Sequence, residues 1–154
     1  MTGPMAHSRA RRNPADGRAL VRRVAAIVGV VFLVIGVLGF IPGVTTYYSD
    51  LRFAGHDSEA KLFGLFQVSV LHNIVHLLFG VAGLALARTV SGARTFLVGG
   101  GAIYLVLWLY GLVVDHSSGA NFIPVNGADN WLHLFLGVGM IALGVLTTRR
   151  PSRH

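Results

Sequence analysis

The chain has 154 residues, of which 53% are hydrophobic and only 12% are charged. A soluble domain usually carries roughly 25% charged residues, so this composition indicates a protein whose main solvent is lipid. The lack of cysteine in the sequence excludes a disulfide framework, a thiolate metal site and a cysteine nucleophile. The net charge of +7 suggests an anionic partner, and the placement of the charges decides which kind.

The first segment, residues 1–19, is polar and basic and has no periodic apolar face, which predicts a disordered cytoplasmic arm. Every residue from 24 to 41 is apolar or Gly, a run long enough for a membrane-spanning helix. A cleaved signal peptide has a shorter apolar region followed by small residues, so we expect this helix to be retained.

Three later apolar segments predict three more spanning helices. Their approximate bounds are 62–87, 95–114 and 130–148. Ser91 and Gly92 mark a tight turn before the third helix, and Asp129 or Asn130 is expected to cap the fourth.

The expected fold class is therefore all-α, a membrane-spanning four-helix bundle. The transmembrane domain covers residues 20–149, and a short cytoplasmic tail, 150–154, follows it. The solvent of this domain, and hence its first partner, is the lipid bilayer.

The positions of Lys and Arg predict the orientation of the bundle. All of the thirteen basic residues except Arg52 and Lys61 lie on the side that holds the arm, the short turn and the tail. All of the six acidic residues except Asp16 lie on the opposite side. Because cytoplasmic loops carry the excess of Lys and Arg, we expect both termini in the cytoplasm and both longer loops outside.

The basic arm is expected to contact anionic lipid head groups of the plasma membrane. It has no aromatic residues interleaved with its arginines and no nucleic-acid-binding motif, so no nucleic-acid partner is expected.

One polar pattern occurs twice, as HNIVHLLFG at 72–80 and DNWLHLFLG at 129–137. Both copies have Asn, His, Leu and Gly at the same places, and His133 follows His76 by 57 residues (133 minus 76). Aligning the copies divides the chain into two helical hairpins of the same topology, which predicts a parallel repeat about an axis along the membrane normal.

Residues at i, i+3 and i+4 share a helix face, so the polar side chains of each copy project together. Small residues continue both stripes, which allows close helix approach, and at 1.5 Å per residue both stripes lie in the outer half of the membrane. We therefore expect an outward-facing polar pocket between the second and fourth helices, with two aromatic side chains of the third helix as a wall. The candidate pocket residues are His72, Asn73, His76, Tyr104, Trp108, Asp129, Asn130 and His133.

Several interpretations of this cluster are open, since ionisable residues at membrane depth are functional candidates. In the simplest, His76 and His133 are neutral and hydrogen-bond to neighbouring helices, which stabilises each by about 1 kcal/mol. Alternatively, His72, His76, Asp129 and His133 hold Zn, Cu(II) or non-haem Fe, because His residues at i and i+4 grip one ion.

A third interpretation is b-type haem between His76 and His133, with a redox role. A fourth interpretation is a small-solute transporter. Four short helices can form a pore only as an oligomer, so this interpretation requires several copies of the chain. The leading interpretation is a non-enzymatic structural or accessory membrane component whose apolar faces bind another membrane subunit or a second copy. No catalytic residue is assigned, because Ser69 is the only serine within a span and no His–Asp pair surrounds it.

Four phrases resemble a known family: GFIPG at 39–43, FQVSVLHNIVH at 66–76, YLVLWLYG at 104–111 and NWLHL at 130–134. Over roughly residues 20–148 the chain resembles the actinobacterial integral membrane proteins grouped as domain-of-unknown-function family 4383. The resemblance implies four membrane helices in the plasma membrane of a high-GC Gram-positive bacterium, and it implies no activity.

Overall fold

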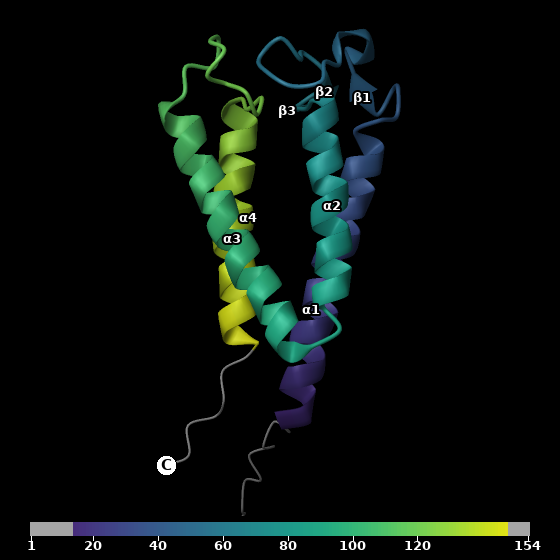
Figure 1. Cartoon of the computed structure of the whole chain (residues 1–154), viewed down its shortest axis with the longest axis vertical. Helices are drawn as coiled ribbons and strands as arrows, with labels where there is room; N and C mark the ends of the chain where they lie inside the picture. Colours follow the sequence, from purple (N-terminus) through teal and green to yellow (C-terminus); the bar gives the residue numbers. More distant parts are fainter. Residues whose placement is uncertain (1–13, 148–154) are drawn as a thin grey trace, which may run out of the picture.

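The computed structural model describes residues 14–147, and four helices make up most of them. The helices are α1 (Pro14–Leu38), α2 (Val70–Leu86), α3 (Val90–Val113) and α4 (Gly127–Leu146). The predicted all-α class is confirmed. Helix α1 packs along α2 and α3 packs along α4, and the two pairs converge at the α2–α3 turn and diverge toward the end that carries the longer loops (Figure 1).

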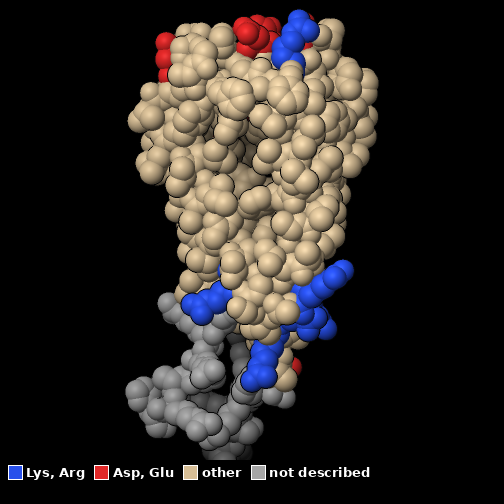
Figure 2. All heavy atoms as spheres, in the orientation of Figure 1, with Lys and Arg blue, Asp and Glu red and all other residues tan. Residues whose placement is uncertain are grey.

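Three of the helices, α1 from Ala15, α3 and α4, are long and apolar enough to cross a membrane. Helix α2 is equally apolar but has 17 residues. In the space-filling view an uncharged band separates most of the Lys and Arg, at the α2–α3 end, from most of the Asp and Glu at the other end, where a basic side chain also lies (Figure 2). The apolar helices therefore indicate a lipid bilayer as the environment of this protein.

The helix ends differ from the expected bounds at several places. Helix α3 begins at Val90, five residues earlier than expected (95 minus 90), so Ser91 and Gly92 lie in its first turn and do not form the expected tight turn. The cap is Thr89, whose hydroxyl accepts a hydrogen bond from the Gly92 amide at 2.9 Å. Helix α4 begins at Gly127, three residues earlier than expected (130 minus 127).

Helix α1 begins at Pro14, so residues 14–19 of the expected disordered arm are helical, and Pro is well suited to a first helical turn because it needs no amide donor there. Helix α2 begins eight residues later than expected (70 minus 62), after Ser69, whose hydroxyl accepts a hydrogen bond from the His72 amide at 3.1 Å. Residues 1–13 and the expected tail, 150–154, lie outside the described residues.

A small antiparallel sheet, which the sequence did not predict, precedes α2. Its strands are β1 (Thr45–Thr46), β2 (Lys61–Leu62) and β3 (Phe66–Gln67), in the order β1-β2-β3. The β2–β3 turn places Phe63 and Gly64 at φ of 54° and 71°, the left-handed conformation that a tight hairpin requires. Ala60, Leu62 and Val68 are buried in a small core under this sheet, and Phe66 packs against it, so these apolar side chains are buried without a helix.

Glycines bring the two helices of each pair into backbone contact. A Cβ atom on Gly80 of α2 would lie 2.8 Å from the carbonyl oxygen of Gly29 on α1. A Cβ atom on Gly137 of α4 would lie 3.0 Å from the carbonyl oxygen of Gly101 on α3. Such close approach is typical of membrane helices, whose interfaces are rich in small residues.

The main core lies where the two pairs converge. It joins side chains of all four helices and closes the space between the pairs at this end. Its buried residues are Val21, Ala25, Phe32, Ala87, Ala93, Phe96, Leu97, Tyr104 and Met140.

Candidate functional site

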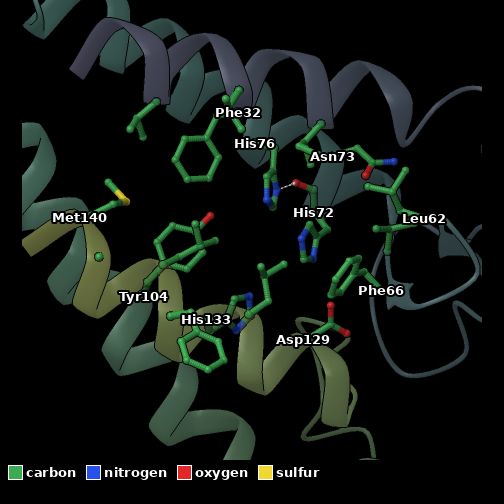
Figure 3. A pocket seen from close by; sticks show the side chains of 18 of the residues that line it. Phe32, Leu62, Phe66, His72, Asn73, His76, Tyr104, Asp129, His133 and Met140 are labelled. Atoms are coloured by element: carbon green, nitrogen blue, oxygen red, sulfur yellow. Dashed lines mark hydrogen bonds between the residues drawn. The ribbon is translucent and has the colours of Figure 1, made fainter. Parts of the chain in front are cut away.

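Between the diverging pairs lies a cavity of about 350 Å³. Helices α1, α2 and α4, strands β2 and β3, and one residue of α3 contribute its wall (Figure 3). Its polar lining residues are His72, Asn73, His76, Tyr104, Asp129 and His133. All other lining residues are apolar or glycine, so the polar groups form one cluster in an apolar pocket.

Six of the eight candidate residues thus line one cavity, and two do not. Trp108 lies one turn beyond Tyr104 on α3, where this helix has diverged from α1, so only Tyr104 reaches the pocket. Asn130 instead packs against Gly111 of α3, and its side-chain amide donates to the Gly111 carbonyl at 2.7 Å.

The rings of His72 and His76 stack face to face, with centroids 4.5 Å apart and planes 9° apart. Nδ1 of His76 lies 2.9 Å from the carbonyl oxygen of His72. Because a carbonyl only accepts, this Nδ1 carries the proton, and Nε2 of the neutral His76 ring is left as a hydrogen-bond acceptor. Nδ1 of His72 is buried and has no partner among the described residues.

Aromatic contacts continue from His76 to the other helix pair. The Phe32 ring lies 5.6 Å from the His76 ring and stacks on Tyr104 at the same distance, and Tyr104 lies 5.3 Å from His133. His133 is only 3% exposed, and its Nδ1 has no partner within residues 14–147. These four rings, which we call the ring row, border the cavity at its deep end (Figure 3).

Asp129 lies at the opposite, outer end of the cavity and has a structural role. Its Oδ2 accepts hydrogen bonds from the backbone amides of Asn126 at 2.9 Å and of Gln67 at 3.1 Å. Asn126, and not Asp129 or Asn130, caps α4, and Asp129 is the third helical residue of a capping box. The bond to Gln67 ties α4 to strand β3.

The residues expected to hold a metal ion do not fit one. No group of three or more His, Asp or Glu side chains in the described part of the chain is arranged to hold an ion. The rings of His72 and His76 lie nearly parallel, so the in-plane lone pairs of their nitrogens do not converge on one point, and Oδ2 of Asp129 already accepts two amide hydrogen bonds. Haem between His76 and His133 stays a prediction.

Sequence reasoning missed Phe32, Gln67 and the strand residues that roof the cavity. Gln67 carried a signal, since it is a polar residue inside an apolar run. Phe32 carried none, because it is one apolar residue among eighteen in the first apolar run.

Comparisons with known proteins add one finding. No curated protein and no solved structure matches this chain significantly. A family model described as Domain of unknown function (DUF4383) matches residues 22–146, a range that contains every residue lining the cavity. The chain therefore belongs to the DUF4383 family, as the four shared phrases implied.

Proposed function

We propose that this protein is a non-enzymatic, multi-pass membrane component that binds a small molecule in the pocket between its helix pairs. The observation that carries the proposal is a set of polar atoms without partners around an apolar cavity. Nδ1 of His72 and Nδ1 of His133 are buried and unpaired within residues 14–147. Buried polar groups are nearly always hydrogen-bonded, so these two nitrogens indicate that the wall of the cavity is incomplete without a bound molecule or ordered water.

The proposed topology has four spans, with the α2–α3 turn in the cytoplasm and both longer loops outside. Arginines at the converging end support it, since Arg88 and Arg94 flank the turn and Arg22 donates to the Ala87 carbonyl there. The chain lacks cysteine, so single cysteines can be labelled cleanly. In intact cells of a bacterial host, an impermeant maleimide should label Ser117→Cys and leave Ser91→Cys unlabelled until the membrane is permeabilised. The reverse pattern would invert the topology.

The two pairs are proposed to be a parallel repeat. Gly29 and Leu33 contact Gly80, and Gly101 and Leu105 contact Gly137 in the same way. The α1 residues precede their α3 counterparts by 72 positions (101 minus 29, 105 minus 33), whereas Gly80 precedes Gly137 by 57. The same offset of 72 relates Phe32 to Tyr104, which stack on each other at the centre of the ring row.

Binding in the pocket is tested by filling it. Gly139 lines the cavity, and a Cβ atom there would meet nothing within 4 Å, so Gly139→Phe extends a ring into open space. Gly99→Phe on α3 is the matched control, because its Cβ atom also meets nothing and Gly99 does not line the cavity.

Mass spectrometry of organic extracts should find one molecule in stoichiometric amount with wild-type protein and with Gly99→Phe. The same molecule should be absent from Gly139→Phe, which should remain folded by circular dichroism. An empty wild-type extract, or equal amounts in both variants, would contradict the proposal and leave His72 and His133 solvated by ordered water.

A further inference from the structure

We propose that the pocket takes a neutral lipid-phase alcohol or phenol, an apolar body with one hydroxyl group, which enters sideways from the bilayer between α1 and α4. This inference rests on the proposed function, because it names the ligand and the entry route of the same pocket. It follows from where the cavity is closed, where it is open and which hydrogen bonds its wall leaves unmade.

The cavity is closed toward both membrane surfaces. At the deep end the main core, including Phe32, Tyr104 and Met140, separates it from the α2–α3 turn. At the outer end strands β2 and β3 cover it, and the Gln67 amide is fixed to Asp129. Neither end offers a path for a molecule from water.

The open side lies between α1 and α4. These helices border the cavity on opposite sides and contribute most of its lining residues (Figure 3). Lining residues of both helices are also exposed on the surface, for example Ile27 at 63% and Phe135 at 70%. Both are apolar and lie within helices long enough to cross a membrane, so the mouth faces the hydrocarbon of the bilayer.

The charge of the wall selects a neutral head group. No Lys or Arg lines the cavity, so a carboxylate or phosphate would enter without a counter-charge, which is strongly unfavourable in an apolar site. A cationic head group would find one acidic lining residue, Asp129, which lies at the end of the cavity opposite the ring row and whose Oδ2 already accepts two amide hydrogen bonds (Figure 3).

The hydrogen bonds left unmade select a hydroxyl. Nε2 of His76 is an acceptor that needs a donor, since the ring proton is on Nδ1. The Tyr104 hydroxyl borders the same cavity and makes no hydrogen bond to any described residue, so it is free to donate. A ligand hydroxyl donates to one and accepts from the other, whereas a ketone or quinone carbonyl leaves His76 unpaired.

The test compares three probes that share a ten-carbon chain: 1-decanol, n-decane and decanoate. Their size suits a cavity of about 350 Å³. Two readouts on the full chain in detergent are the thermal midpoint as a function of probe concentration and the ¹⁵N shift of His76 Nε2, assigned with His76→Leu.

Decanol should raise the thermal midpoint saturably and move the ¹⁵N shift of His76 Nε2. The Tyr104→Phe variant, titrated in the same way, should bind decanol about tenfold more weakly. Decane should bind more weakly than decanol and leave the Nε2 shift unchanged, and decanoate should not bind. Gly139→Phe should abolish the decanol effects, and Gly99→Phe should keep them.

Equal binding of decane and decanol, or tighter binding of decanoate, would overturn the hydroxyl assignment and leave the binding pocket intact. If no probe binds although wild-type extracts contain a molecule, this ligand class is wrong and the proposed function stands. If no probe binds and the extracts are empty, both fall.

Discussion

The contacts within each helix pair and the space between the pairs are built on opposite principles. Within a pair, glycines such as Gly29 and Gly80 let backbones touch, and a single added carbon would collide with main-chain atoms. Between the pairs, bulky rings and imidazoles border a cavity, and Gly139 faces open space. The same residue type thus closes one interface and leaves the other open.

The difference separates the parts of the molecule that hold it together from the part that is free to bind. Close glycine contacts between membrane helices gain their stability from packing alone, because lipid gives no hydrophobic drive for helices to associate. A cavity forfeits such packing, and under the proposed function a ligand supplies the missing contacts. Four sets of variants test this division.

The largest effect is expected from closing the gap within the α3–α4 pair. In Gly101→Val the new Cβ atom would lie 2.7 Å from the carbonyl oxygen of Gly137, and overpacking of this kind destabilises by about 3 kcal/mol. Gly99→Val, two residues away, adds its side chain where nothing lies within 4 Å. Thermal unfolding in detergent should show a much lower midpoint for Gly101→Val, and a nearly unchanged midpoint for Gly99→Val. Equal midpoints would mean that the glycine contact does not hold this pair together.

The next effect concerns the bond that spans the pairs at the outer end. Asp129→Ala leaves the amides of Gln67 and Asn126 without their acceptor and should lower the unfolding free energy by about 1–2 kcal/mol. Asp129→Asn keeps an oxygen in place and should recover most of the loss. If Asn destabilises as much as Ala, the negative charge of Asp129, and not the geometry of its bonds, is what matters.

A smaller effect is expected from the two asparagines of the repeated pattern. Asn130→Ala removes a hydrogen bond to the Gly111 carbonyl, worth about 0.6 kcal/mol between membrane helices. Asn73 packs against Gly39 but its Nδ2 has no partner among the described residues, so Asn73→Ala should destabilise less. The comparison of unfolding free energies would be reversed if the amide of Asn73 holds a ligand during purification.

The smallest effect is expected at Ser117, whose hydrogen bonds to Asp115 stay within the exposed loop after α3. The Ser117 hydroxyl donates to Asp115 at 2.7 Å and its amide donates at 3.0 Å, and these bonds hold the pKa of that carboxyl below its ordinary value. A lowered pKa contributes stability above the pKa of the unfolded chain, and this is lost as the pH falls through the folded pKa. In Ser117→Ala a carbon-13 titration should show a higher pKa, with decanol binding unchanged at neutral pH.

Much of the helical frame could be predicted from the sequence, because apolar runs such as 24–41 are long and carry no rival pattern. The His-containing faces of α2 and α4 were also predictable, since helical spacing alone places His72 beside His76 and Asp129 beside His133. Six of the eight candidate residues line one cavity for this reason.

The segment before α2 could not be predicted in this way. Residues 62–69 are as apolar as the helix that follows them, and only the left-handed turn at Phe63 and Gly64 diverts them into strands. The role of Asp129 was hidden for a similar reason, because its partners, Gln67 and Asn126, are chosen by tertiary contact and not by spacing along the helix.

The hydrogen bond between the Gln67 amide and Asp129 links the two helix pairs at the end where they diverge. The pairs are joined covalently by the short connection between Leu86 and Val90. At the far end they are held together by this bond and by two more, from the Asn126 side chain to the Leu65 carbonyl at 2.9 Å and from the Gly55 amide to the Phe122 carbonyl at 2.9 Å. A ligand too wide for the space between the pairs must therefore break the hydrogen bonds at the far end. The loops that carry these bonds lie at the end of the molecule where the pairs diverge (Figure 1). Occupancy of a space buried in the membrane would thereby be signalled on its surface.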